Sequence, residues 1–320
     1  MLNRNTLLIK VASFYYEDDL TQSEIAKKIG VSRPTVASML KEAREKEIVK
    51  IIIQNNYYEE GVLRNREFEL ANKYDLKSVS ISSTYKNEAE TKAEIGRLCA
   101  EFIEKRREKI NALGISWGTT VKAFVDAANY VNFPNLEVDP LIGGVSITDT
   151  ALHSNHLSFT LGQKYKAYSH SFYAPVIAEN KEIKKFLYNS EVVQNILEKG
   201  RSVDLAVIGV GNPQKSKTHR HMRYITSEEE QDINETNAIG DILTTFYDQE
   251  GEPVITSLTD RMIGPSLKDI QNMKEVIVLA NGKNKVISIK SLLKMNIINH
   301  LFIDDEIAKQ LWERIPFYGY

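Results

Sequence analysis

The chain has 320 residues, 41 Lys and Arg against 43 Asp and Glu, and a formal net charge of −2. This length allows two domains or one large one, and its single cysteine, Cys99, excludes an intrachain disulfide and a cysteine-based metal site. No uncharged apolar run reaches the ~18 residues of a membrane span, and no cleavage site follows the N-terminus. We therefore expect a cytoplasmic protein without membrane attachment.

The charge is unevenly distributed along the chain. Residues 1–56 carry nine Lys and Arg against seven Asp and Glu, a balance of +2, and the remainder carries 32 against 36, a balance of −4. This weak asymmetry permits nucleic-acid binding at the N-terminal end but does not establish it.

The first fifty residues contain three segments with helical periodicity. The first lies in 7–16, and the second runs from Thr21, which forms a capping box with Glu24, to Gly30, a residue type that ends helices. A third helix begins after Ser32, and Pro34 lies in its first turn, where a missing N–H costs nothing. The residues expected to face the interior are Leu8, Val11, Ala12, Tyr15, Ile25, Ala26, Ile29, Val36, Leu40 and Ala43.

The second and third of these helices, joined by a glycine-containing turn, form the pattern of a helix-turn-helix. A following run, Ile48–Gln54, is typical of a strand and would give the unit a winged character. The alternative is an ordinary helical hairpin with a solvated polar face, but the combined cap, turn and Ser-Arg-Pro-Thr start is more specific than that. We expect contacts to double-stranded operator DNA from Gln22, Ser32, Arg33, Pro34, Thr35, Ser38 and Lys41.

The stretch LTQSEIAKKIGVSRPTVASMLKEAREKEIVKI resembles the N-terminal domain of SorC/DeoR-type sugar-responsive bacterial transcriptional regulators, and most of all their deoxyribonucleoside-regulator branch. That family usually carries Ser and Arg where this chain has Ala37 and Ser38. The resemblance implies the same mode of DNA binding, and the difference concerns which operator sequence is bound.

Beyond the first module the pattern alternates between helices and strands. A charged amphipathic helix is expected from about Tyr57 to Tyr74, which could link or pair subunits. The order that follows is typical of an α/β fold with a doubly wound, largely parallel, Rossmann-like sheet. The expected strands lie in 77–82, 109–116, 136–144, 203–211, 275–280 and 300–304, and the helices between them include Glu88–Arg106, Val121–Tyr130 and Lys285–Met295. We expect a helix-turn-helix domain in 1–56 and an effector-binding and oligomerisation domain in 57–320.

Four of the expected strands end in loops that contain glycine. In sheets of this kind ligands bind beyond the carboxyl ends of the strands, where glycine lets the backbone approach them. One such loop is usually only a turn, but four at equivalent positions outline one cleft: GISWGTT, LIGGVS, VIGVGN and VLANGKNK. The residues expected to line it are Gly114, Ser116, Trp117, Gly118, Thr119, Thr120, Gly143, Gly144, Gly209, Gly211 and Gly282.

The residue types of this cleft favour a phosphorylated sugar. Thr119 and Thr120 bring hydroxyl groups to a helix start, whose free N–H groups attract an anion. Both are open to the alternative of a simple helix cap, and Trp117 could stack on a sugar or fill the core. Lys285 is placed to add a positive charge.

Three further polar positions are candidates for the same cleft. Arg261 could offer a planar fork to a phosphate, and Asp241 and Asp260 could accept hydrogen bonds from sugar hydroxyls. An ordinary salt bridge is an equally good account of Arg261 and Asp260. Asn155 could hold a sugar hydroxyl or cap the next helix.

The second half of the chain also resembles the SorC-type effector-binding domain, over nearly its full length. The shared stretches are GISWGTT, LIGGVS, HSNHL, APV, DLAVIGVG, GDI…FYDQEG, DRMIGPSLKDI and VLANGKNKVISI. The resemblance implies a sugar or sugar-phosphate effector, with the phosphate held by the GTT turn, Lys285 and Arg261. The deoxyribonucleoside regulators carry a lysine where Ile142 stands here, and that amine could form an imine with an aldehyde sugar. We therefore expect non-covalent binding and no cofactor other than the effector.

No metal site is expected from the sequence. The segment KSKTHRHMR places His219 and His221 among cations, without further ligands at fitting spacing. It is interpreted as a solvated loop, with a lid over an anionic ligand as the alternative.

Two functions of different classes follow from these patterns. The leading hypothesis is a homo-oligomeric transcriptional regulator, dimer or tetramer, that acts as a repressor of a carbohydrate-utilisation operon and responds to a sugar phosphate. The alternative is a sugar-phosphate isomerase-like enzyme with Asp241 or Asp260 as general base. A DNA-binding module would be pointless on a plain isomerase, so we expect a regulator and not an enzyme.

Overall fold

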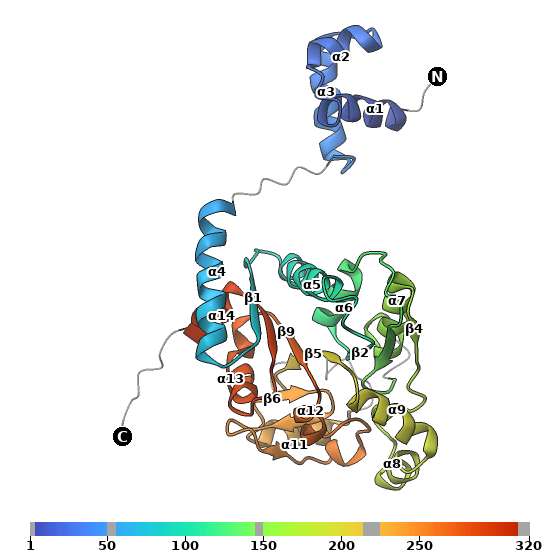
Figure 1. The fold of residues 1–320 in the computed structure, drawn as a ribbon, viewed down its shortest axis with the longest axis vertical. Coiled ribbons are helices and arrows are strands. Elements are labelled where there is room, and N and C mark those ends of the chain that lie inside the picture. The colour runs from blue at the N-terminus through green and yellow to red at the C-terminus, as the bar shows by residue number, and fades with distance from the viewer. Residues whose placement is uncertain (1–3, 50–55, 145–149, 214–224, 313–320) are drawn as a thin grey trace. The chain divides into compact units, whose positions relative to one another are not determined.

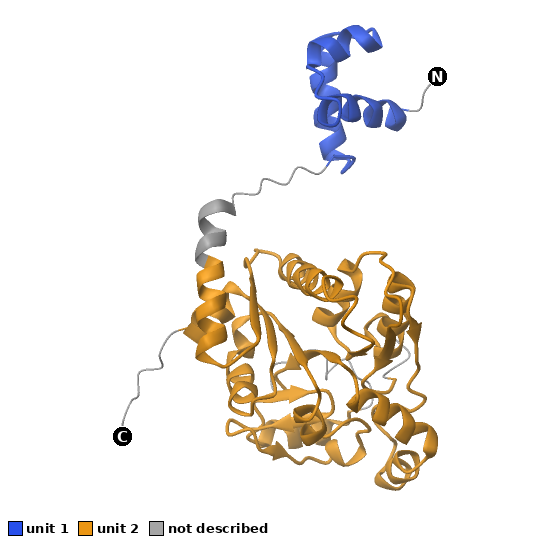
Figure 2. Cartoon of the chain, in the orientation of Figure 1, with its two compact units in different colours: residues 1–60 blue, residues 61–320 orange. Residues whose placement is uncertain are grey.

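The computed structural model describes residues 4–49, 56–144, 150–213 and 225–312, with the backbone alone for 56–62 (Figure 1). The chain divides into two compact units, residues 1–60 and residues 61–320 (Figure 2). Among the described residues, none of the helices combines the length and the hydrophobicity needed to span a bilayer.

Unit 1 contains the three expected helices. Its elements are α1 (Arg4–Tyr16), α2 (Gln22–Ile29) and α3 (Arg33–Glu45). The capping box of Thr21 and Glu24 is present, and Gly30 ends α2 in the left-handed conformation at φ 73°. Ser32 caps α3 by accepting a hydrogen bond from the Thr35 N–H. The predicted helix-turn-helix is therefore confirmed.

The interior of unit 1 is a small core shared by all three helices. Its fully buried residues are Leu8, Val11, Ala12, Ile25, Ala26, Val36, Met39, Leu40 and Ala43. Tyr15 and Ile29, expected inside, are only half-buried, and Met39 was not predicted. Ile48 and Val49 lie in a bend, not in the expected strand, and the rest of that strand lies outside the described residues.

Unit 2 is built on one parallel sheet with an antiparallel extension. The parallel strands stand in the order β1-β10-β9-β5-β2-β3-β4, and β6, β7 and β8 continue antiparallel from the end of β5. The strands are β1 (Ser78–Ser82), β2 (Ala112–Ile115), β3 (Glu137–Pro140), β4 (Tyr168–Ser169), β5 (Leu205–Gly211), β6 (Gly240–Ile242), β7 (Thr245–Tyr247), β8 (Pro253–Val254), β9 (Val276–Ala280) and β10 (His300–Asp304). This confirms the expected doubly wound architecture and adds the antiparallel strands, which were not predicted.

Helices precede, connect and follow these strands. They are α4 (Asn56–Lys73), α5 (Glu88–Glu104), α6 (Thr119–Ala127), α7 (Ser154–Tyr165), α8 (Lys181–Tyr188), α9 (Glu191–Arg201), α11 (Ser227–Glu235), α12 (Leu267–Gln271), α13 (Val286–Lys294) and α14 (Asp305–Trp312). Three short 3₁₀ turns complete the described elements: η1 (Thr150–Leu152), η2 (Thr259–Arg261) and η3 (Lys283–Lys285).

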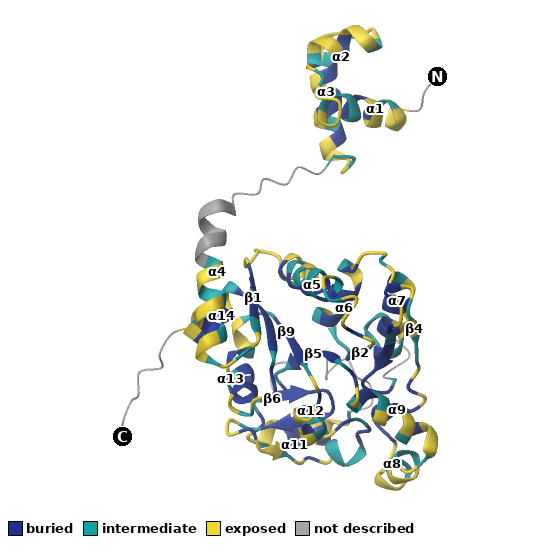
Figure 3. Ribbon diagram, in the orientation of Figure 1, coloured by how far each residue is buried: buried dark blue, intermediate teal, exposed yellow. Residues whose placement is uncertain are grey.

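The central strands are covered on both faces. Every residue of β9 and β10 is buried, and Figure 3 shows β9 in the colour of buried residues. Two clusters of apolar side chains share them: Val278 belongs to one and Leu279 to the other. Neighbouring strand residues point to opposite faces, so the continuous apolar runs seen in the sequence are those of strands buried on both sides.

The chain changes direction across the sheet between β2 and β5. From β2 the chain proceeds outward through β3 to β4, and it then returns to place β5 on the opposite side of β2. Such a switch point opens a crevice between the carboxyl ends of the two strands, where ligands bind in open α/β sheets.

Candidate functional site

The residues predicted to contact DNA lie on the outside of the helix-turn-helix. Ser32, Arg33, Pro34, Ser38 and Lys41 are exposed, and Gln22 and Thr35 are half-buried. The opposite face of α3 carries the buried core residues of unit 1. This face of α3 is therefore available to a partner.

Two features of this face bear on its use. Arg33 forms no ion pair with any described residue of unit 1, whereas Lys41 lies 3.8 Å from Glu45 in an exposed pair. The hydroxyl oxygens of Ser32 and Thr35 lie 2.7 Å apart at the start of the helix. These two hydroxyls thus help to organise the helix start from which the Arg33 side chain extends.

Unit 2 contains a cavity of about 600 Å³ at the carboxyl ends of five parallel strands. Its size is within the range of small-molecule sites, which is about 300–1,000 Å³. The lining residues are Thr84, Tyr85, Lys86, Glu88, Thr91, Lys92, Trp117, Gly118, Thr119, Thr120, Val121, Gly209, Val210, Gly211, Asp241, Asn281, Gly282, Asn284, Lys285, Asp304 and Glu306. The residues quoted from three of the four glycine loops therefore converge on one cavity.

One wall of the cavity is the start of α6. Gly118 is the N-cap of this helix at φ 107°, a conformation that L side chains rarely adopt, and no side chain caps the helix. Thr119 and Thr120 are its first two residues, so neither is the N-cap. The first N–H groups of a helix have no partner within it, and the residues that carry them here, Thr119 and Thr120, line the cavity.

A second wall of the cavity contains a half-buried cation, Lys285. Lys285 ends the η3 turn and caps α13, and Gly282 precedes that turn at φ 85°. Burial lowers the pKa of Lys285 below its ordinary value, while Asp241 acts in the opposite direction. Lys92, another cation that lines the cavity, also lowers this pKa.

Among the described residues, two of the four carboxylates that line the cavity are buried, Asp241 and Asp304. Asp241 of β6 is buried and stands opposite Gly211, where a side chain would meet its Oδ1 at 1.8 Å. Any larger residue at position 211 would clash with the Asp241 side chain, so glycine is required there. Asp304 accepts hydrogen bonds from the N–H groups of Gly282, at 2.6 Å, and Ile307, at 2.9 Å. Burial raises the pKa of Asp304.

Sequence reasoning missed the parts of the cavity that follow β1 and β10. Both strands are predicted by their apolar runs, but no glycine follows either strand to mark a ligand-binding loop. The rule that ligands bind beyond the carboxyl ends of parallel strands would have found them without any glycine signal. The missed residues there are Thr84, Tyr85, Lys86, Glu88, Thr91, Lys92, Asp304 and Glu306. Four more lining residues, Val121, Val210, Asn281 and Asn284, belong to the walls that were expected but were not named.

Four residues expected in the cleft do not line the cavity: Gly114, Ser116, Gly143 and Gly144. Gly114 lies inside β2, where a Cβ would meet Leu141 at 2.6 Å, and Gly143 packs against a backbone oxygen at 2.1 Å from a built Cβ. Ser116 is buried and accepts a hydrogen bond from the Gly209 N–H. Gly144 lines a different cleft. Gly114, Gly143 and Ser116 therefore serve close packing. A local sequence pattern does not distinguish a glycine or serine needed for packing from one that contacts a ligand.

Asn155 and Asp260 do not line the cavity either. Asn155 lies within α7, where Oδ1 accepts a hydrogen bond from the Phe172 N–H at 2.8 Å and Nδ2 donates to the Phe172 carbonyl at 3.1 Å. It neither caps the helix nor lines the cavity. Asp260 forms an ion pair with Lys181 on α8. Each side chain is held by a partner distant in sequence.

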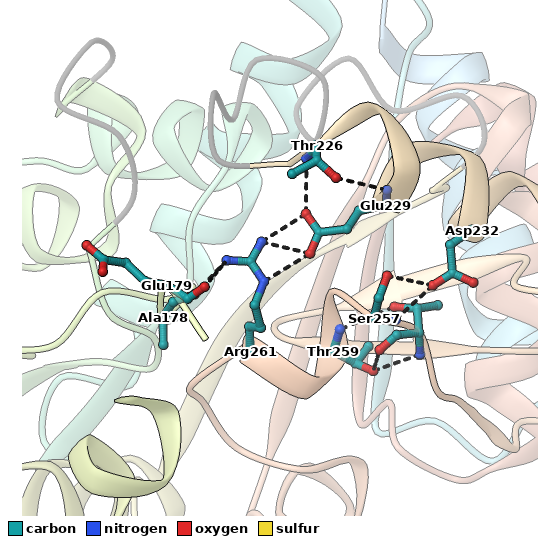
Figure 4. A network of polar contacts seen from close by, with 9 residues as sticks. Ala178, Glu179, Thr226, Glu229, Asp232, Ser257, Thr259 and Arg261 are labelled. Carbon is teal, nitrogen blue, oxygen red and sulfur yellow. Dashed lines mark hydrogen bonds and ion pairs between the residues drawn. The ribbon is translucent and has the colours of Figure 1, made fainter. Parts of the chain in front are cut away.

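Arg261 belongs to a structural network and not to the cavity (Figure 4). Its guanidinium group binds both carboxylate oxygens of Glu229, at 2.8 and 2.9 Å, and donates to the Ala178 carbonyl at 2.6 Å. Glu229 in turn completes the capping box of α11 with Thr226. The side chains of Arg261 and Glu229 are 16% and 9% exposed, so this is a largely buried ion pair.

Two predicted features lie outside the described residues. The segment Lys215–Arg223, with its two histidines, is one, and the second half of the LIGGVS loop is the other.

Comparison with known families supports both units. Residues 62–313 match the family described as "Putative sugar-binding domain", and residues 15–50 match "Winged helix-turn-helix DNA-binding". The sorbitol operon regulator of Klebsiella pneumoniae is 30% identical over 95% of this chain and 97% of its own length. The deoxyribonucleoside regulator of Bacillus subtilis is 27% identical over 96% of this chain and 97% of its own length.

Solved structures show the same similarity. The full-length sorbitol operon regulator SorC from Klebsiella pneumoniae superposes with a TM-score of 0.79 at 28% identity, covering 98% of this chain and 100% of that one. A DeoR family transcriptional regulator from Listeria monocytogenes gives a TM-score of 0.72 at 30% identity and covers 78% of this chain and 99% of that one. These relatives are named as regulators rather than as enzymes. This chain belongs to the family of SorC/DeoR-type sugar-binding transcriptional regulators, with an N-terminal helix-turn-helix that binds DNA and an α/β sugar-binding domain.

Proposed function

We propose that the 600 Å³ cavity binds a sugar phosphate non-covalently, and that its occupancy controls the affinity of the helix-turn-helix for an operator. The observation that carries this proposal is the uncapped start of α6 and the half-buried Lys285 in the wall of one cavity. In this proposal the protein is a homo-oligomeric repressor of a carbohydrate-utilisation operon and not an enzyme.

The phosphate end of the ligand is assigned from charge. A helix start presents several N–H donors and a partial positive charge, which together favour an anion. Lys285 adds a full charge in a place where burial weakens competition from water, and an anion placed beside it would offset the cost of that burial. A divalent phosphate satisfies both groups.

The sugar end is assigned from the acceptors. Asp241 and Asp304 are buried carboxylates in the same cavity as Trp117, which is half-buried and packs against the core. Carboxylates accept hydrogen bonds from sugar hydroxyls, and an indole face covers the apolar face of a sugar ring. The mixture of cationic and anionic walls fits a ligand with one charged end and one hydroxylated end.

Non-covalent binding is proposed because the cavity offers no amine at the position that carries one in the deoxyribonucleoside regulators. Ile142 is fully buried among apolar side chains and does not line the cavity. An imine would have to use one of the three lysines that do line it, and the proposed role of Lys285 requires its amine to stay protonated.

An isomerase-like activity would need a general base in this cavity. Asp260 lies outside it, which leaves Asp241 of the two carboxylates considered. Incubating the purified protein with phosphorylated pentoses and hexoses, and measuring product by chromatography, tests this alternative. Turnover that is lost in Asp241→Asn would contradict our assignment of the protein as a regulator alone.

The ligand class is tested by calorimetry with two proteins and two ligands. A panel of sugar phosphates is first screened by thermal shift, since a ligand at a hundredfold excess over its dissociation constant raises stability by about 2.7 kcal/mol. The best ligand and its unphosphorylated sugar are then titrated into the parent and Lys285→Ala. We expect the variant to lose roughly ten- to a hundredfold affinity for the sugar phosphate and none for the unphosphorylated sugar. An equal loss for both ligands would contradict the phosphate assignment.

The oligomeric state is proposed from the DNA-binding mode, because helix-turn-helix proteins bind two half-sites as dimers. Light scattering on the full-length protein, with and without operator DNA, measures it. A monomer in both conditions would contradict this part of the proposal.

A further inference from the structure

Three potential metal ligands gather at the β3–β4 edge of the sheet. Glu137 and Asp139 are two residues apart on β3 and so point to the same face. Strands β3 and β4 are parallel, with Val138 opposite Ser169, and the His170 N–H donates to the Val138 carbonyl at 3.0 Å. This register places His170 beside Asp139 on the neighbouring strand. The fold itself therefore assembles one imidazole and two carboxylates.

The donor atoms of this cluster are close together. One ligand atom from each of Glu137, Asp139 and His170 lies within 4.8 Å of the other two. Nδ1 of His170 lies 2.8 Å from Oδ1 of Asp139, and Nε2 lies 3.8 Å from Oε2 of Glu137. Two atoms bound to one zinc ion at about 2.1 Å stand roughly 3.0–3.5 Å apart, so small side-chain rotations suffice to bring these atoms onto a common ion.

The buried carboxylate provides the second observation. Asp139 is 1% exposed, and its Oδ1 has no hydrogen-bond partner among the described residues. The same holds for Nδ1 of His170, which lies 2.8 Å from this oxygen and forms an ion pair with it only when the imidazole is protonated. A buried carboxylate oxygen without a hydrogen bond is costly. A cation coordinated by both atoms would satisfy both of them.

We propose that Glu137, Asp139 and His170 bind a divalent transition-metal ion of the zinc class, at a site separate from the effector cavity. Imidazole nitrogen with carboxylate oxygen is a ligand set that suits zinc, and water would complete the coordination. None of the three residues lines the effector cavity. A metal here would fasten the edge strand β4 to β3.

Lys199 of α9 makes the proposal testable in both directions. Its ammonium group lies 2.7 Å from Oε2 of Glu137, so it forms an ion pair with one of the proposed metal ligands. A cation entering the site has to displace or tolerate this ammonium group. Removal of Lys199 should therefore strengthen metal binding, while removal of a ligand should weaken it.

The experiment is a titration of chelator-treated, full-length protein with Zn²⁺, followed by calorimetry, and with Co²⁺, followed by its visible absorption. The parent should bind one ion at this site. Asp139→Asn, which preserves shape, and His170→Ala should each lose at least tenfold affinity and the Co²⁺ absorption band. Lys199→Met should bind several-fold more tightly than the parent. The matched control is His219→Gln with His221→Gln, which removes two histidines elsewhere in the sequence and should leave this ion in place.

Three results would overturn the proposal. The first is that neither the parent protein nor Lys199→Met binds Zn²⁺ or Co²⁺ at about 1 mM of the ion. The second is an unchanged stoichiometry and affinity in Asp139→Asn and His170→Ala. The third is loss of the ion in the His219/His221 control alone. Circular dichroism of each variant shows whether it is folded, and the gain in Lys199→Met does not depend on the stability of the ligand variants.

Discussion

At the scale of single residues, Arg33 gives the most specific prediction about DNA binding. It stands exposed at the first turn of α3, and the N-terminal residues of a recognition helix contact base edges. We expect Arg33→Ala to weaken operator binding by about 1–3 kcal/mol at fixed salt. Arg44→Ala, at the far end of the same helix, is the matched control. Equal operator affinity in both variants, measured by fluorescence anisotropy, would show that Arg33 does not contact a base.

Lys285 gives a prediction in pH. Burial lowers its pKa, so its charge is lost at a lower pH than that of an exposed lysine. The affinity for a sugar phosphate should therefore fall as the pH rises toward the ordinary lysine value of about 10.5, because the neutral amine no longer attracts the anion. In Lys285→Arg the guanidinium group stays charged, and the affinity should be flat over the same range. Calorimetry at several pH values measures both, and parallel curves would contradict the assignment.

Arg261 illustrates how a residue of the right chemistry can have a structural role. Its partner Glu229 is buried, so Arg261→Met leaves an uncompensated buried carboxylate, which typically costs about 3–5 kcal/mol. Lys181→Met removes an exposed ion pair with Asp260 and should cost under about 1 kcal/mol. Urea denaturation of the two variants measures the difference. If Arg261→Met unfolds like the parent but loses effector affinity, the residue acts in ligand binding after all.

At the scale of elements, the boundary between the two units falls within the sequence of α4, and the second half of this helix belongs to unit 2. Leu70 is fully buried in the larger core, Glu67 accepts a hydrogen bond from the Ile81 N–H at 2.7 Å, and Tyr74 donates to the Leu311 carbonyl at 2.8 Å. We expect a fragment of residues 57–320 to fold and to bind the effector with the affinity of the parent. Circular dichroism and calorimetry on the isolated fragment measure both.

The control for this prediction is a shorter fragment, residues 77–320, which lacks α4. It should be less stable, because the core surface under Leu70 and the carboxylate of Asp305, which pairs with Arg66, lose their partners. A 57–320 fragment that fails to fold would show that the units share a core.

The elements themselves were largely predictable, and the reason is local. Capping residues such as Thr21 and Ser32, and apolar runs such as 276–280, act within a few residues of themselves. The antiparallel strands β6 to β8 were missed because two or three residues are too few to show an alternating pattern.

The cavity was predictable only in part, for a different reason. Glycine loops identified the walls at Gly118 and Gly282, whose backbone needs the residue type. Asp260 and Arg261 were placed there wrongly, because their partners Lys181 and Glu229 lie 79 and 32 positions away and no local pattern reveals them. The cluster of Glu137, Asp139 and His170 was missed likewise, since only strand pairing unites it.

At the scale of the whole molecule, the proposed function requires that ligand binding in unit 2 change DNA binding by unit 1. If Lys285 acts only through the phosphate, Lys285→Ala should bind the operator as tightly as the parent without ligand. The sugar phosphate that shifts the operator affinity of the parent should leave that of the variant unchanged at the same concentration. Fluorescence anisotropy with labelled operator measures all four conditions. An altered affinity in the ligand-free variant would place Lys285 in the coupling rather than in ligand recognition.

The pairing of β1 with β10 also has a consequence for how the protein is synthesised. Among the described strands, β1 has no other neighbour in the sheet, and Ser78 meets His300 across 222 positions. On a ribosome that adds about 5–20 residues per second, β1 thus waits roughly 10–45 s for its partner to emerge. The three helices of unit 1 need only local contacts, so they can form early in that interval. A nascent chain is therefore able to present its DNA-binding face before its ligand-binding domain has closed.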